Sequence, residues 1–161
     1  MRLHTQQKRS EGMIDSLAHA LLDAAREQAE KSWNEGGIPI GAALAHMDGT
    51  IVSRGHNLRV QTGDPTAHAE MVCIRNAGRR RDWSELAMAT TLSPCQMCSG
   101  AACLLELKRL IIGENQTFQG AEHWLEEHGI HVTVINDPRC VELMKRMQKE
   151  QPDLWLEDIG G

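Results

Sequence analysis

The sequence predicts one α/β domain of three layers (α/β/α), with a mostly parallel central sheet of about five strands flanked by helices. Short apolar segments bounded by turn residues alternate with longer segments in which apolar residues recur every three to four positions. This alternation is typical of strands and helices built around one sheet. The chain has 161 residues, the usual length of a single domain. We expect the domain to cover residues 13–161, and the polar residues 1–12 to form a mobile tail.

The first half of the domain is predicted to hold a helix, a hairpin and a second helix. Apolar residues at helical spacing are followed by two glycines, which end a helix. Two short apolar segments are then separated by a Met-Asp-Gly turn, and an Asp-Pro pair can cap and open a further helix. These patterns predict, in order, a helix over residues 13–35, strands over 40–47 and 50–56, and a helix over 65–77.

The second half is predicted to alternate strand and helix. A Ser-Pro pair repeats the cap-and-proline signal, and prolines also open the last two helical segments. The strands are short segments rich in leucine, isoleucine and valine. The predicted strands cover residues 86–92, 110–112 and 131–135, and the predicted helices cover 95–107, 120–128, 138–149 and 152–155.

Composition argues against several classes of partner. The formal net charge is -5, from 17 Lys+Arg against 22 Asp+Glu, whereas a protein that grips a nucleic-acid backbone needs a basic surface. No apolar run approaches the roughly 18 residues of a membrane span, and residues 1–12 lack the apolar core of a signal peptide. The 5 cysteines cannot all pair with one another, which indicates a reducing compartment. We therefore expect a soluble cytoplasmic protein without nucleic-acid or membrane partners.

Two short segments contain the residues of a metal site. They are His68-Ala69-Glu70 and Pro94-Cys95-Gln96-Met97-Cys98. Cys95 and Cys98 are three positions apart at a helix start, so both sulfurs point to one side. One imidazole and two thiolates form the ligand set of a catalytic zinc site with an open fourth position, where zinc lowers the pKa of bound water toward about 7. We expect His68, Cys95 and Cys98 to bind Zn²⁺, and Glu70 to transfer protons.

The pattern H-x-E followed by P-C-x-x-C is the signature of zinc nucleobase deaminases. Over residues 13–160 the sequence also resembles the small fungal-type cytosine deaminases, and its carboxyl-terminal stretch is more specific to that branch than the metal motif is. The matching stretches cover residues 35–41, 55–57, 68–70, 90–95, 113–115 and 155–160. The resemblance implies a cytidine deaminase-like fold and a homodimer with one zinc ion per subunit. It also implies that the protein converts cytosine and water to uracil and ammonia, in pyrimidine salvage.

The resemblance further implies hydrogen-bonding roles for three residues around the base. The side chain of Asn57 and the backbone N–H of Ala69 would donate to the pyrimidine carbonyl. The backbone carbonyl of Ser93 would accept from the departing amino group. Ala69 stands where these proteins have glycine, and Gln96 where they commonly have aspartate. We expect neither difference to disturb the metal.

Four other residues would enclose the base, according to the same resemblance. Phe118 and Trp155 would cover the ring, with Trp155 on a carboxyl-terminal lid helix, and Ile40 would line the pocket or the adjacent core. Asp158 would accept from the ring N1–H. In a nucleoside N1 carries ribose, so this buried carboxylate would lose its partner, at a cost of about 1–3 kcal/mol, and would meet the sugar. A free base is therefore the expected substrate.

Three alternatives stay open at this point. Leu156 stands where fungal-type cytosine deaminases typically have an aromatic residue, which could change the pocket, so isocytosine or another amino-heterocycle is an alternative base. A guanine deaminase would use the same metal motif, and so would a tRNA adenosine deaminase, although the acidic balance argues against tRNA. A non-catalytic zinc-binding scaffold is the third alternative, but such a scaffold would have no need of Glu70.

Overall fold

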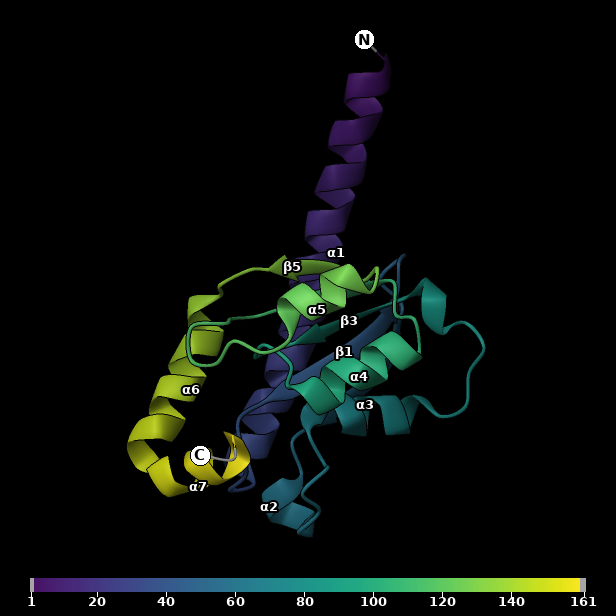
Figure 1. Ribbon diagram of the computed structural model, residues 1–161. Helices are drawn as coiled ribbons and strands as arrows, with labels where there is room; N and C mark the ends of the chain where they lie inside the picture. Colours follow the sequence, from purple (N-terminus) through teal and green to yellow (C-terminus); the bar gives the residue numbers. More distant parts are fainter. Residues whose placement is uncertain (1, 160–161) are drawn as a thin grey trace.

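A five-stranded sheet with the order β2-β1-β3-β4-β5 forms the middle layer of the computed structural model, which describes residues 2–159 and the side chains of residues 16–159 (Figure 1). The strands are β1 (Gly41–His46), β2 (Ile51–His56), β3 (Leu86–Thr90), β4 (Arg109–Ile112) and β5 (His131–Val134). Strand β1 pairs antiparallel with both β2 and β3, whereas β3 with β4 and β4 with β5 are parallel. Four strands therefore share one direction and β1 alone is reversed.

The predicted three-layer α/β fold is confirmed, and the pairing of its sheet is mixed rather than mostly parallel. The hairpin places β1 beside β2, and the chain then crosses over β1 so that β3 pairs with its other edge. Both neighbours of β1 consequently run against it. The sequence pattern identified the hairpin, but the strand order that makes the second antiparallel pair depends on tertiary packing.

Helices cover both faces of the sheet (Figure 1). Side chains of β1 alternate between two cores. Ala42 and Leu44 pack in the core beneath α3 (Ala69–Ala77), α4 (Gln96–Leu104) and α5 (Glu122–Glu127), and Ala43 and Ala45 pack beneath α1 (Arg2–Asn34). The strand side chains facing α1 are mostly alanine, and a Cβ at Gly41 would collide with the α1 backbone, so α1 packs closely on the sheet. The helices are α1 (Arg2–Asn34), α2 (Arg59–Thr62), α3 (Ala69–Ala77), α4 (Gln96–Leu104), α5 (Glu122–Glu127), α6 (Pro138–Glu150) and α7 (Pro152–Ile159), with a short 3-10 helix at Trp83–Glu85.

The start of the chain is predicted to be a mobile tail over residues 1–12, and its mobility stays a prediction. Residues 2–12 form the first turns of α1, which project away from the sheet (Figure 1). These residues include good helix formers and the sequence has no proline before Pro39, so nothing ends the helix near residue 13. Met1 of the predicted tail lies outside the described residues, as do Gly160 and Gly161 of the predicted domain.

The last part of the chain forms the helix that is predicted to be a lid. Helix α7 extends to Ile159, beyond the predicted end at residue 155, and its Trp155 is buried in the larger core. It follows α6 directly and packs against that helix. Within the described part of the chain, no helix is both long enough and apolar enough to cross a bilayer.

Candidate active site

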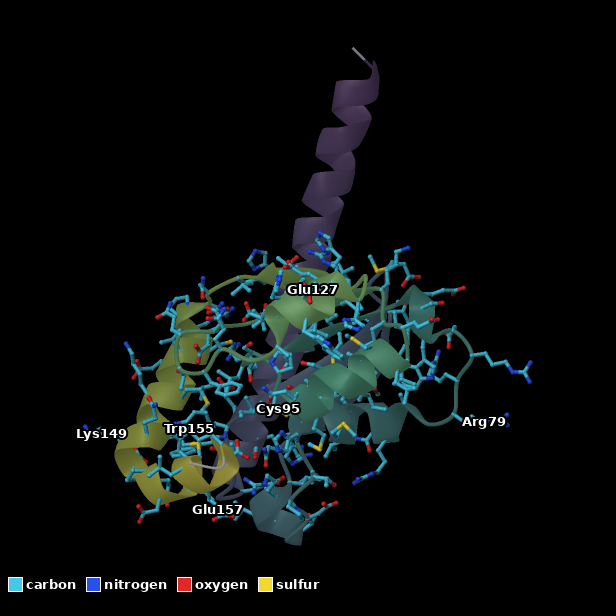
Figure 2. All side chains as sticks on the ribbon, viewed as in Figure 1. Arg79, Cys95, Glu127, Lys149, Trp155 and Glu157 are labelled. Carbon is cyan, nitrogen blue, oxygen red and sulfur yellow. The ribbon has the colours of Figure 1, made fainter. Side chains whose placement is uncertain are left out.

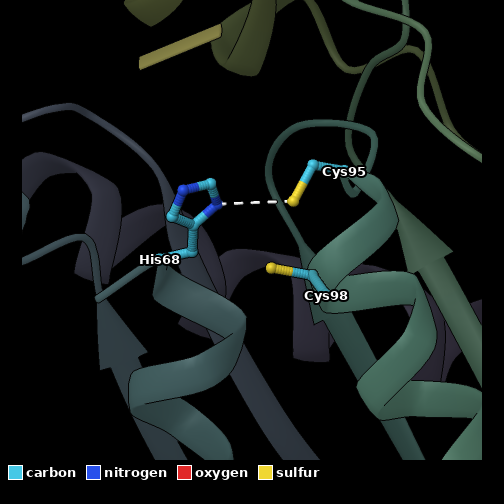
Figure 3. Close-up of side chains that lie close together, drawn as sticks. All are labelled: His68, Cys95 and Cys98. Carbon is cyan, nitrogen blue, oxygen red and sulfur yellow. Dashed lines mark hydrogen bonds between the residues drawn. The ribbon is translucent and has the colours of Figure 1, made fainter. Parts of the chain in front are cut away.

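The starts of α3 and α4 bring the three predicted zinc ligands together. His68 is the N-cap of α3 and Cys95 is the N-cap of α4, and Cys98 lies in the first turn of α4. Figure 3 shows the three side chains facing one another, with Nδ1 of His68 and Sγ of Cys95 3.5 Å apart. Their ligand atoms all lie within 4.8 Å of one another. Both helices begin later than predicted, but the expectation that the ligands lie at helix N-termini is confirmed.

These atoms fit a tetrahedral zinc ion. Zinc with nitrogen and sulfur ligands at about 2.0–2.3 Å separates its ligand atoms by roughly 3.3–3.8 Å, which matches the 3.5 Å between His68 and Cys95. One imidazole and two thiols are also the ligand set of catalytic rather than structural zinc sites, which keep a fourth position open. The three residues can therefore hold zinc and leave room for a reacting molecule.

The two cysteines differ in acidity because they share a hydrogen bond. That bond lowers the pKa of Cys95 to about 4 and raises the pKa of Cys98, whose burial acts in the same direction. A hydrogen bond with Cys95 raises the pKa of His68. The lowered pKa of Cys95 favours its thiolate, which is the form that binds zinc, and metal binding also has to release the proton of Cys98.

Glu70 lies beside the triad and is 5% exposed. Its Oε1 accepts from the hydroxyl of Thr90 at 3.0 Å, and its Oε2 accepts from the thiol of Cys98 at 3.4 Å. Burial raises the pKa of this carboxyl. A carboxyl with a raised pKa holds a proton more readily than an ordinary carboxyl, which suits a general acid and base.

The triad and Glu70 open into a cavity of about 310 Å³. Nine of the eleven predicted site residues line it. They are Ile40, Asn57, His68, Glu70, Ser93, Cys95, Phe118, Trp155 and Asp158. Of the other two, Cys98 belongs to the triad, and Ala69 is buried between His68 and Glu70. Figure 2 labels Cys95, at the start of α4, and Trp155, on α7, and both residues line this cavity.

The amide of Asn57 has one free end. Its Oδ1 accepts from the backbone N–H of Arg59 at 3.0 Å, which fixes the orientation of the amide. Its Nδ2 is buried and has no hydrogen-bond partner among the described residues. A buried donor without a partner is costly, so the cavity presents an N–H group to an acceptor on a ligand.

Ser93 is fixed by its side chain and leaves its backbone carbonyl free. Its hydroxyl accepts from the N–H of Gly120 and donates to Glu122. A Cβ at Gly120 would collide with the carbonyl of Pro94, so only glycine lets the segment after Phe118 approach this closely. The backbone carbonyl of Ser93 accepts no hydrogen bond from any described residue, and it is therefore available to a ligand.

Asp158 reaches the cavity from α7 and lies against Arg59 and His68. Its Oδ1 accepts from the Arg59 guanidinium at 2.6 Å and lies 3.9 Å from Nε2 of His68. The Asp158 side chain is 5% exposed and that of Arg59 is 13% exposed. Neither Arg59 nor Thr90 was predicted as a site residue, because neither lies in a spacing pattern that indicates chemistry.

A match over residues 15–114 identifies the family of this chain. Residues 15–114, which include the triad and Glu70, match the family described as "Cytidine and deoxycytidylate deaminase zinc-binding region". The chain belongs to this family of zinc-binding deaminases. As a member, it is a hydrolase with a zinc site, and His68, Cys95 and Cys98 form the ligand triad of that site.

Relatives of this deaminase act on different molecules, to judge by their names. The cytosine deaminase of Candida albicans is 45% identical over 141 residues, which are 86% of this chain and 94% of that protein. A tRNA-specific adenosine deaminase of Streptococcus pyogenes is 39% identical over 105 residues, 63% of this chain and 65% of that protein. A solved structure from a study of A-to-I editing by tRNA:A34 deaminases has a TM-score of 0.69 at 27% identity, covering 76% of this chain and 97% of the other.

Proposed function

We propose that this deaminase converts free cytosine to uracil and ammonia. The observation that carries the proposal is the Asp158 carboxylate in the wall of the cavity that holds the triad and Glu70. A carboxylate there accepts from the N1–H that free cytosine has and cytidine lacks. The relative named cytosine deaminase, which matches over nearly its whole length, supports the same substrate.

The residues around the cavity complement the other edges of cytosine. The free Nδ2 of Asn57 donates to the carbonyl oxygen of the base. Ala69 is the first residue of α3, where a backbone N–H has no acceptor within the helix, so it is available to the same oxygen. The backbone carbonyl of Ser93 accepts from the amino group, and Phe118 and Trp155 enclose the ring.

Glu70 moves the protons of the reaction. Zinc held by His68, Cys95 and Cys98 supplies an activated water when it is bound. As the water oxygen adds to the amino-bearing carbon, Glu70 takes a proton from it and places that proton on the neighbouring ring nitrogen. Glu70 then takes the second proton of the same oxygen and gives it to the amino group. The carbon–nitrogen bond breaks, ammonia leaves and the new carbonyl of uracil forms.

A substrate panel tests the proposal. Ammonia release is measured from cytosine, isocytosine, cytidine and guanine at equal concentrations, and inosine formation from a tRNA anticodon stem-loop is measured beside them. We expect cytosine to have the highest kcat/KM. A higher kcat/KM for isocytosine or guanine would show that this base, and not cytosine, is the substrate. Inosine formation would show that the protein acts on tRNA and not on a free base. No turnover of any amino base by zinc-loaded protein would favour the scaffold hypothesis.

We also propose that the protein acts as a homodimer through the outer face of α4. Leu104 is 83% exposed and Met97 on the same helix is 37% exposed. Between them, a Cβ at Gly100 would meet open space. Exposed apolar side chains on one helix face favour a protein partner. Mass measurement in solution should give a dimer for the wild type and a monomer for Leu104→Glu, and a monomeric wild type would contradict the proposal.

The cysteines support a cytoplasmic location. Cys73, Cys95, Cys98, Cys103 and Cys140 are all free thiols. Free thiols persist in reducing compartments and are oxidised or paired in secreted proteins. Cell fractionation tests this part of the proposal, and recovery of the protein in an oxidising compartment would contradict it.

A further inference from the structure

Arg59 contacts Asn57 and Asp158, the two side chains that hydrogen-bond to the base in the proposed function. Its backbone N–H donates to Oδ1 of Asn57 at 3.0 Å, and its guanidinium Nη1 donates to Oδ1 of Asp158 at 2.6 Å. Asn57 follows β2 and Asp158 lies on α7, so these two residues come from distant parts of the chain. Arg59, at the start of α2, joins them.

The backbone contact decides what Asn57 can offer. An amide side chain has one acceptor oxygen and one donor nitrogen, which occupy similar volumes. Because Oδ1 of Asn57 is engaged by Arg59, the nitrogen is left to face the cavity. Arg59 thereby makes Asn57 a donor toward the ligand and not an acceptor.

The side-chain contact decides where Asp158 and its helix lie. The guanidinium also lies 3.8 Å from Glu157, so Arg59 faces two consecutive carboxylates of α7. The pair with Asp158 is largely shielded from solvent, and a shielded pair is screened less by salt than an exposed one. For α7 to move away from the cavity, Arg59 and Asp158 have to separate.

We infer that Arg59 is the positioning residue of the active site, which latches α7 over the bound base and fixes the hydrogen-bonding polarity of Asn57. The inference rests on the proposed function for the identity of the base. Arg59 does not touch the reacting atoms. Its side chain acts through Asp158, and its backbone N–H, which Arg59→Gln would retain, acts through Asn57. Loss of the side chain should therefore weaken the binding and the selection of the base more than the chemical step.

The test compares Arg59→Gln with Arg75→Gln, a matched control. Arg75 is an exposed arginine on α3 that also forms an ion pair, with Asp64 at 3.8 Å. For Arg59→Gln we expect kcat/KM for cytosine to fall roughly tenfold to a hundredfold, the effect of losing a hydrogen bond to a charged group. The loss should lie mainly in KM, with unchanged zinc content and a smaller preference for cytosine over cytidine. Arg59→Lys, which keeps the charge, should recover part of the loss.

A double variant and a binding-independent measurement complete the test. Arg59→Gln with Asp158→Asn should lose no more than the stronger single variant, because both break the same contact. Hydrogen exchange of residues 152–159 should become faster in Arg59→Gln and not in Arg75→Gln. If Arg59→Gln does not fold, Arg59→Lys and Asp158→Asn serve for the same exchange measurement.

The outcomes separate this inference from the proposed function. Additive losses in the double variant, or unchanged exchange in α7 when the contact is broken, would overturn the latch. A wild-type protein inactive on cytosine would overturn the proposed substrate, whereas the exchange result would still decide whether Arg59 holds α7.

Discussion

Thr90 donates a hydrogen bond to Glu70, over 3.0 Å between Oγ1 and Oε1, inside the buried end of strand β3. The same hydroxyl lies 3.1 Å from the carbonyl oxygen of Leu92. A hydroxyl has one proton and can also accept, so Thr90 can serve both states of the carboxyl. It donates to ionised Glu70, and when Glu70 is protonated it can accept from Glu70 and donate to Leu92. Thr90 thus suits a neighbour that gains and loses protons in every turnover.

Replacement of Thr90 by valine should therefore slow the reaction. Valine keeps the shape but removes the hydroxyl, and we predict that kcat falls roughly tenfold to a hundredfold, as for the loss of a hydrogen bond to a charged group. Zinc content, measured by metal analysis, should not change. Thr90→Ser retains the hydroxyl and should keep most of the activity. A valine variant as active as the wild type would show that Glu70 does not need this contact.

Replacement of Asp158 by alanine should relax the choice between bases. The variant no longer leaves an unpaired carboxylate against an N1 substituent, so the ratio of kcat/KM for cytosine over cytidine should fall by about tenfold or more. Asp153→Ala removes an exposed carboxylate from the same helix and is the control. An unchanged ratio in Asp158→Ala would remove the role that we assign to Asp158.

Asp137 should stabilise the fold at neutral pH and less so in acid. It caps α6 by accepting from the backbone N–H of Arg139 at 2.9 Å, and the Arg139 side chain lowers its pKa from the ordinary 3.8. A lowered pKa means that the ionised form stabilises the fold above the unfolded value, and that this contribution is lost as pH falls through the folded value. Asparagine can still cap the helix, so Asp137→Asn removes mainly the charge that pairs with Arg139, and it should reduce the free energy of unfolding by about 1 kcal/mol at pH 7.

Urea unfolding at pH 7 and at progressively lower pH measures this contribution. The difference between wild type and Asp137→Asn should narrow below about pH 4, where the unfolded carboxylate takes up its proton. Asp23→Asn removes only the exposed ion pair with Arg139 and should change stability by less than about 1 kcal/mol. A difference between Asp137→Asn and wild type that stays constant with pH would contradict the role of the charge.

The metal site could be predicted because its signal is local. The spacing of Cys95 and Cys98 within one turn of helix fixes their common direction, whatever the rest of the fold does. The start of α3 was harder to predict, because Asp64 does not cap the helix. Its carboxylate accepts from the N–H and hydroxyl of Thr66, so residues 65–66 form a turn and the helix begins only at Ala69.

Contacts between distant residues could not be read from the sequence. Arg59 meets Asp158 across 99 positions, and Thr90 meets Glu70 across 20. Such pairs depend on the order of the strands and on the path of α6 and α7, neither of which leaves a pattern in composition or periodicity. The antiparallel pairing of β1 with β3 belongs to the same class. The side chains predicted by resemblance, those of Ile40, Asn57, Phe118, Trp155 and Asp158, line the cavity, but their supporting partners became visible only in the structure.

The central claim is that this protein is a zinc deaminase in which Glu70 transfers protons. The most direct test is to measure the turnover of cytosine and the zinc content of the Glu70→Gln variant. The substitution keeps the size of the side chain and leaves His68, Cys95 and Cys98 in place. We predict the zinc content of the wild type and the loss of nearly all turnover. Full activity in the zinc-loaded variant would contradict the claim.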